Sequence, residues 1–429
     1  MAKQNSPLVL GTEPIGKLLT QYAIPAIIAM TASSLYNMAD SIFIGHGVGA
    51  LAISGLALTF PLMNLAAAFG SLVGVGASTL VAVKLGQKDY EGANKVLGNV
   101  LILNVVLGVA FTIAFLFLLD PVLYFFGASE NTISYARDYM RIILYGNVVT
   151  HMYLGLNAVL RSSGFPRMAM YATLASVVIN CALNPLFIFG FGWGIKGSAW
   201  ATVISQVISL TGQLIHFSRP KQLLHFKKGI YRLRSEIVKG ILSIGLSPFL
   251  MNLCSCLIVI LINRGLKEHG GDMAIGAYGI VNRIAFLFVM IIMGFNQGMQ
   301  PIAGYNYGAR LYSRVTDVTR LTMRWAVGVA TLGFSLMCFL HFAFRCRSHR
   351  KGFLPHSCGV FRRWHAPHNF GTTCPEVTSG QSVQKLAPCG ASPAGVFLFG
   401  RSFGFQGAAH RWTTLSLHLN DRPSRISER

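Results

Sequence analysis

Nine stretches of this chain run for 19 or more residues without a single Asp, Glu, Lys or Arg, and this pattern constrains the fold more than any other feature. They are residues 18–39, 45–83, 101–119, 142–160, 168–195, 197–218, 240–263, 284–309 and 325–344. About 20 apolar residues in a helix cross the ~30 Å hydrocarbon core of a bilayer. Lipid offers no partner to an unpaired backbone group, so each stretch should be a helix. We therefore predict an all-α, polytopic membrane protein with nine spanning helices.

Composition agrees with a membrane protein. Hydrophobic residues make up 53% of the chain and charged residues 12%, whereas soluble domains carry about 25% charged residues. The first apolar run is too long for a cleavable signal peptide and lacks a small-residue cleavage site, so we expect it to remain as a helix. The sequence contains no Gly-Lys-Ser/Thr loop for cradling phosphates, so we do not expect ATP hydrolysis to be its energy source.

Basic residues concentrate in alternate loops. One set of loops holds 18 basic and 5 acidic residues, whereas the other set holds 5 of each. By the positive-inside rule the first set, which includes the N-terminus and the run 219–239, is cytoplasmic. The net charge of +22 thus reflects membrane topology and a basic tail, and we expect no nucleic-acid partner.

Residues 345–429 have a different character. They hold 12 basic and 3 acidic residues and 6 of the 12 histidines, with no apolar run long enough to span a membrane. We interpret them as a disordered, out-of-frame or foreign tail, and the DNA beyond codon 344 should then encode apolar helices in another frame. A group of cysteines and histidines in the tail fits no standard zinc-finger spacing, so we expect no metal site; its members are Cys358, His365, His368 and Cys374.

The chain also resembles itself at a separation of about 222 residues. Residues 51–54 align with residues 273–276, and Pro25 and Pro248 both lie early in their apolar stretches. Six helices fall in one period, so the two copies should have the same orientation. We predict a six-helix lobe over residues 1–218, a basic linker over 219–239 and a partial lobe of three helices over 240–344. Both prolines should kink their helices.

Asp40 stands out among the acidic residues because it follows 22 uncharged residues. Ionisable residues within spanning segments are costly and usually mark ion or substrate paths. Four polar residues of other stretches could join it: Asn157, Asn180, Asn184 and Thr202. Carboxylate, amide and hydroxyl oxygens suit Na⁺, and a desolvated carboxylate suits a proton. The alternatives are that Asp40 is an interfacial residue facing water, and that the Asn and Thr side chains only hold helices together.

Several motifs extend from residue 14 to residue 324. In the first half they are Asn37-x-x-Asp40-x-x-Phe43-x-Gly45, Gly86-Gln87-x-Asp89, Asn157-Ala158-x-Leu160-Arg161-x-x-Gly164 and Asn180-x-x-x-Asn184-Pro185. In the second half they are Asn282-Arg283-Ile284 and Gln297-Gly298-Met299-Gln300-Pro301. Together these residues resemble the multidrug and toxic compound extrusion (MATE) family of secondary transporters.

The resemblance implies twelve helices in two lobes, of which about nine are present here. It implies export of organic cations or amphiphiles in exchange for H⁺ or Na⁺ by alternating access, in the cytoplasmic membrane of a bacterium. It places the cation site at Asp40, Asn157, Asn180, Asn184 and Thr202. Some branches carry Asp where this chain has Asn184, which leaves the ion open.

We expect the substrate cleft to include Tyr36, Asn37, Met30 and Met63. We expect a monomer surrounded by lipids, with no cofactor besides the coupling ion. An enzyme would need paired catalytic groups, and Asp40 is the one carboxylate within an apolar stretch. The alternatives are a flippase of lipid-linked precursors, for which only Arg283 supplies mid-membrane positive charge, and a truncated product without activity.

Overall fold

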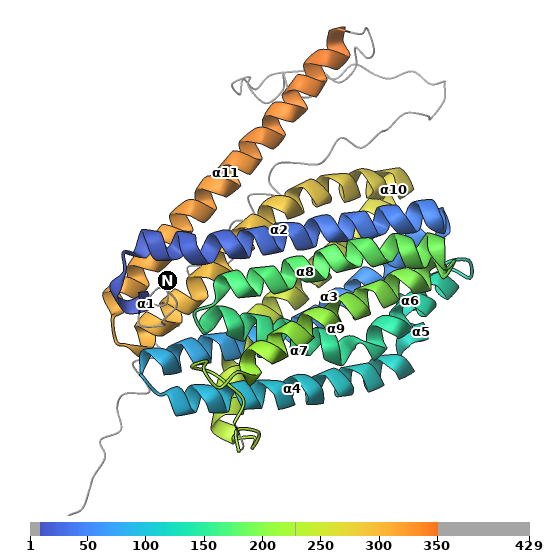
Figure 1. Ribbon diagram of the computed structural model, residues 1–429. Coiled ribbons are helices and arrows are strands. Elements are labelled where there is room, and N and C mark those ends of the chain that lie inside the picture. Colours follow the sequence, from blue (N-terminus) through green and yellow to red (C-terminus); the bar gives the residue numbers. More distant parts are fainter. Residues whose placement is uncertain (1–8, 228, 351–429) are drawn as a thin grey trace, which may run out of the picture. The chain divides into compact units, whose positions relative to one another are not determined.

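The computed structural model describes residues 9–227 and 229–350, and within them every regular element is a helix (Figure 1). The first part contains α1 (Val9–Thr12), α2 (Ile15–Gly47), α3 (Ala50–Gly86), α4 (Tyr90–Phe117), α5 (Leu119–Phe125), α6 (Ile133–Tyr145), α7 (Asn147–Ser162), α8 (Pro166–Pro185), a π-helical turn (Leu186–Gly190) and α9 (Gly194–Ser218). The second part contains α10 (Ser235–Gly308) and α11 (Tyr312–Arg350). The prediction of an all-α protein is confirmed.

All nine predicted spans lie on helices. Among the described residues, six helices are long and apolar enough to cross a membrane. The count rises to seven if α6 and α7, which meet at a bend of 55°, form one broken span. The remaining two predicted spans, 197–218 and 325–344, lie on α9 and α11, which do not meet this criterion. In α9 the reason is a set of polar residues that the bundle buries, described below.

The helix α10 accounts for two predicted spans, 240–263 and 284–309. Its 74 residues would measure about 110 Å if straight, far more than one crossing needs. Its early residues Gly240 and Gly245 lie against Leu80 and Leu72 of α3, whereas its late residues Gly304 and Gly308 lie against residues 79–83 of α3. Both ends of α10 therefore contact the same half of α3 in opposite directions. The chain must reverse between them, as two antiparallel spans require.

Close backbone contacts join α3 to α10. A Cβ atom added at Gly245 would lie 1.8 Å from the carbonyl oxygen of Leu72, and one added at Gly76 would lie 2.0 Å from that of Ile241. Likewise, Gly294 and Gly298 of α10 lie against backbone atoms of Ile27 and Ala23 on α2. Only glycine permits backbones to approach this closely, as in the small-residue motifs of membrane helices. These contacts lie in the half of the bundle where α2 begins and α3 ends.

The turn between α3 and α4 explains one of the sequence motifs. Lys88 has a positive φ of 60°, and the Asp89 carboxylate then caps α4 by accepting a hydrogen bond of 2.8 Å from the amide of Gly92. That bond, together with the nearby Lys84 ammonium at 3.0 Å, lowers the pKa of the Asp89 carboxyl group below its usual value. The Gly86-Gln87-x-Asp89 motif is thus a helix-terminating and helix-capping device.

Several predictions concern segment boundaries. The helix α10 begins at Ser235, inside the predicted linker, and α11 continues past residue 344 to Arg350. Residues 351–429 lie outside the described part of the chain, and with them Cys358, His365, His368 and Cys374. Pro25 lies inside α2 and Pro248 inside α10. The kinks expected at these prolines stay a prediction.

Candidate functional site

Asp40 lies inside the bundle rather than at its surface. It is on α2, and only 5% of its surface is exposed. The hydroxyl group of Ser198 on α9 donates a hydrogen bond to its carboxylate oxygen Oδ1, and the amide of Asn184 on α8 interacts with the same carboxyl group. A buried carboxylate is costly unless it is paired or hydrogen-bonded. This burial argues against an interfacial Asp40 that faces water.

A series of hydrogen bonds extends from Asn184 through Asn180 to Thr202. Asn184 donates to the side-chain oxygen of Asn180 at 2.7 Å, and Asn180 donates to the hydroxyl of Thr202 at 3.2 Å. Asn180 and Asn184 are four residues apart on α8, so they share one face of that helix. The structure therefore brings together four of the five predicted cation-site residues.

One polar atom in this series of side chains has no hydrogen-bond partner among the described residues. The side-chain oxygen Oδ1 of Asn184 is fully buried and forms no hydrogen bond with any described residue. A buried acceptor without a donor costs free energy, so it needs a physical explanation. This oxygen belongs to the side chain that interacts with the Asp40 carboxyl group, so it is a candidate second oxygen ligand for a cation bound there.

Two tyrosines also belong to this cluster. Tyr36, one helical turn before Asp40, shares a 3.0 Å hydrogen bond with the Thr202 hydroxyl. Tyr139 of α6 is 1% exposed, and its side chain also interacts with Thr202. Sequence reasoning placed Tyr36 in the substrate cleft and missed Tyr139 and Ser198. A buried tyrosine needs a partner for its hydroxyl, but no local pattern separates it from an exposed one.

Asn157 lies apart from this cluster. Its amide donates to the backbone oxygen of Ala169 at 2.9 Å and to the Thr173 hydroxyl at 3.3 Å, and its oxygen accepts a bond from Arg161. Thr173 precedes Asn180 by seven residues of α8, about 10 Å along the axis. Asn157 thus ties α7 to α8 and does not contact Asp40.

Replacing Asn157 is expected to affect stability and not ion coupling. Asn157→Ala removes two bonds to α8 and leaves Arg161 without this acceptor, which should cost about 1–3 kcal/mol. The midpoint of thermal unfolding should fall, whereas the ion dependence of transport should match that of the parent. Asn180→Ala, the matched change within the Asp40 cluster, should alter ion dependence. An altered ion dependence in Asn157→Ala would place Asn157 in the ion site after all.

The other predicted cleft residues have separate surroundings. The Met30 sulfur atom faces Gln297 of α10 at 3.5 Å, and Asn37 is exposed and bonds Ser33 of its own helix at 3.0 Å. Met63 packs within the first lobe, against a core to which α2 to α6, the π-helical turn and α9 contribute. Their assignment to one substrate cleft stays a prediction.

Buried polar residues continue along α9 beyond Thr202. Ser205, Ser209 and Gln213 follow at spacings of three or four residues, so they share the face that carries Ser198 and Thr202. The Ser209 hydroxyl and both ends of the Gln213 amide have no hydrogen-bond partner among the described residues. Sequence reasoning missed this polar face, although its spacing was visible.

Sequence comparisons relate this chain to known proteins. The MatE family model matches residues 25–186 and 244–356. The multidrug export protein MepA of Staphylococcus haemolyticus is 31% identical over 293 residues, which are 68% of this chain and 65% of that protein. The same-named protein of Staphylococcus aureus is 28% identical over 74% of this chain and 69% of its own length. This chain thus spans about two-thirds of the length of these relatives.

Solved structures of transporters are also similar to this chain. An outward-facing multidrug resistance transporter of the MATE family aligns with a TM-score of 0.73 and 27% identity, covering 77% of this chain and 74% of that one. A transporter of the MOP superfamily from Pyrococcus furiosus also aligns with a TM-score of 0.73, at 25% identity, over 82% of this chain and 78% of that one. The family match covers most of the helices described above, including α2, which carries Asp40. This chain belongs to the MATE family.

Proposed function

We propose that this protein exports cationic or amphiphilic small molecules in exchange for H⁺ or Na⁺, with Asp40 as the ion-coupling carboxylate. The observation that carries the proposal is a buried carboxylate, Asp40, that interacts with the side chain of Asn184, whose oxygen atom has no hydrogen-bond partner among the described residues. Such a pair gains a favourable interaction when a cation arrives and loses it when the cation leaves.

The ligand chemistry favours a hard cation or a proton. Asp40, Asn184 and the hydroxyl groups of Ser198 and Thr202 present oxygen atoms. Oxygen ligands suit hard cations, and burial among apolar helices suits the neutral, protonated form of a carboxyl group. Binding or release of H⁺ or Na⁺ changes the charge of the site. This change of charge can favour one arrangement of the bundle over another.

The contacts of α10 support alternating access. They lie on residues 22–27 of α2 and 72–86 of α3, at the same end as the basic loops. If that end is cytoplasmic, the two parts of the chain are closed toward the cytoplasm. This agrees with the similarity to a transporter described as outward-facing. Opening of these contacts would then expose the site to the cytoplasm.

The names of the relatives support the substrate class. MepA proteins are multidrug exporters, and we extend multidrug export to this chain as part of the proposal. The protein would act as a monomer in the cytoplasmic membrane of a bacterium, with lipids around it and its N-terminus inside.

The proposal is tested by measuring ethidium movement in membrane vesicles that contain the protein. An imposed pH gradient or an imposed Na⁺ gradient should drive ethidium against its concentration gradient, and dissipating that gradient should stop it. A rate of ethidium uptake that is the same with and without each gradient would contradict ion-coupled export.

A further inference from the structure

Two short segments, each leading into a long helix, are bound by the other part of the chain. Residues 9–13 lead into α2 of the first part, but their hydrogen-bond donors lie on α10 and α11. Residues 229–234 lead into α10 of the second part, but their side-chain partner lies on α4. We call these segments the N-terminal strap and the linker strap. The proposed ion site involves neither of them.

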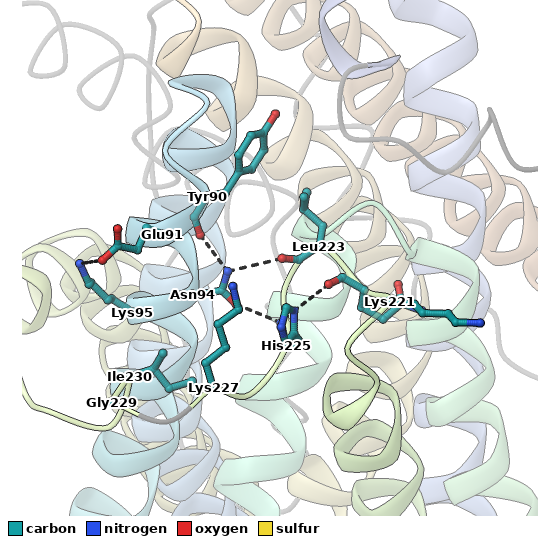
Figure 2. A pocket seen from close by; sticks show the side chains of 11 residues that line it. Tyr90, Glu91, Asn94, Lys95, Lys221, Leu223, His225, Lys227, Gly229 and Ile230 are labelled. Carbon is teal, nitrogen blue, oxygen red and sulfur yellow. Dashed lines mark hydrogen bonds and ion pairs between the residues drawn. The ribbon is translucent and has the colours of Figure 1, made fainter.

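The chain before the linker strap is already fixed to α4. Figure 2 shows the Asn94 side chain at the edge of a pocket, between two backbone groups of the linker. Asn94 donates to the backbone oxygen of Leu223 at 3.4 Å and accepts from the backbone amide of His225 at 3.0 Å. A side-chain amide can satisfy both backbone groups of an irregular segment in this way.

The linker strap itself is bound by the next buried asparagine of α4. Asn99 is fully buried, donates to the backbone oxygen of Arg232 at 3.2 Å and accepts from the backbone amide of Arg234 at 3.0 Å. Ile230 approaches α4 at Gly98, where an added Cβ atom would collide with its carbonyl oxygen. The backbone of the linker strap is therefore held directly against α4.

The N-terminal strap is bound where α10 ends and α11 begins. Asn306 of α10 is fully buried and donates to the backbone oxygen of Leu10 at 3.0 Å. Arg314 of α11 donates to the same oxygen at 3.3 Å and to the backbone oxygen of Glu13 at 2.6 Å. The last carbonyl groups of a helix have no partner within it, so these three bonds satisfy the end of α1.

The two straps occupy equivalent places in the sequence repeat. Leu10 and Arg232, whose carbonyl oxygens accept bonds from α11 and α4, are 222 residues apart. The donor helices also correspond, because α4 follows α3 as α11 follows α10. Each part of the chain thus binds the segment that leads into the other part.

Helices α3 and α10 meet in the same reciprocal way beside the N-terminal strap. A Cβ atom added at Gly86 would collide with the carbonyl oxygen of Tyr305, and one added at Gly308 would collide with that of Val83. Gly86 and Gly308 are 222 residues apart, and so are Val83 and Tyr305. Exchanged contacts of this kind are expected of two repeats related by a two-fold axis.

The straps leave little slack between the two parts of the chain. The amide of Arg234 is bonded to α4, and the next residue, Ser235, begins α10. Likewise, Glu13 is bonded to Arg314, and α2 begins two residues later at Ile15. An extended chain spans at most about 3.6 Å per residue, so separating these helices by more than a few ångströms has to break the bonds.

We propose that the two straps are latches that hold the bundle closed at the end that carries the basic loops, and that both release when this end opens. The inference rests on the proposed alternating access, which requires such an opening. Because the bonds of each strap exist only in the closed arrangement, removing them should favour the open one. The straps would thereby set the ratio of the two arrangements without contacting the ion.

The test measures the distance between two spin labels on the full chain by pulsed electron paramagnetic resonance. The labels are attached at two exposed positions, Glu91→Cys on α4 and Arg320→Cys on α11, after the native cysteines are replaced by serine. Asn99→Leu and Arg314→Met each remove two bonds to a strap. One hydrogen bond changes an equilibrium constant about fivefold, so each variant should raise the ratio of long-distance to short-distance molecules about 30-fold.

The matched controls are Asn252→Leu and Arg324→Met, which make the same chemical changes away from the straps. Asn252 donates to Pro248 of its own helix, and Arg324 is exposed. Both controls should keep the distance distribution of the parent. Thermal unfolding shows which variants are folded, and the two straps supply independent variants.

Parent-like distances in the folded strap variants, or an equal shift in the controls, would overturn the proposal. Because the measurement uses neither an ion gradient nor ethidium, such a failure would leave the proposed role of Asp40 unaffected.

Discussion

Asp40→Asn is expected to reduce ion-driven ethidium transport to the level of vesicles without the protein, while leaving the protein in the membrane. The substitution preserves the size of the side chain and can still accept the bond from Ser198. It removes the charge that a proton or Na⁺ would neutralise. Transport should be lost under both a pH gradient and a Na⁺ gradient, because neither cation retains its carboxylate.

The matched control for this substitution is Asp317→Asn. Asp317 is an exposed carboxylate near the start of α11, so the same chemical change there should leave transport at the parent rate. Amounts of both variants in the membrane are compared by quantitative blotting. Parent-like transport by Asp40→Asn under both gradients would remove Asp40 from the mechanism.

Gly245→Val is expected to give the second large effect, on assembly of the bundle. Even the first atom of the new side chain would lie 1.8 Å from the carbonyl oxygen of Leu72, so α10 and α3 must move apart. Overpacking of this kind costs about 3 kcal/mol, more than valine gains over glycine in helix propensity. The midpoint of thermal unfolding should fall by several degrees. Transport should be lost because α3 and α10 can no longer close against each other.

Gly212→Val is the control for this prediction. Gly212 lies on α9, and a Cβ atom there would meet nothing within 4 Å. This variant should unfold at or slightly above the parent midpoint, since only the helix propensity changes. An equal loss of stability in both variants would show that valine harms these helices generally, without a specific contact between α3 and α10.

Much of the fold follows from the sequence because a membrane imposes simple rules. A charge-free stretch of sufficient length must be largely helical, and each of the nine stretches is, although 101–119 and 142–160 each extend over two consecutive helices. The same rule separated the two antiparallel arms of α10, between which the structure has no non-helical residue. Hydropathy was less decisive for α9, because a helix with one polar face buried inside a bundle is neither fully apolar nor exposed.

The candidate site was harder to predict because hydropathy does not give the rotation of a helix about its axis. Asn180 and Asn184 were correctly grouped, since their spacing alone puts them on one face. Asn157 is equally polar and equally surrounded by apolar residues, but the packing of α7 on α8 directs it to Ala169. Tyr139 and Ser198 were missed because their roles depend on which helices meet at Asp40.

The most direct test of the account asks whether Asp40 itself exchanges a cation. Infrared difference spectra of the purified chain, recorded on a step in pH and on addition of Na⁺, report the protonated and ionised forms of carboxyl groups. We predict a buried-carboxyl signal that responds to at least one of these changes and is absent from Asp40→Asn. Its response to pH alone would identify the proton as the coupling ion, and its response to Na⁺ at constant pH would identify Na⁺. Identical difference spectra of the parent and Asp40→Asn under both changes would contradict the assignment of Asp40 as the coupling carboxylate.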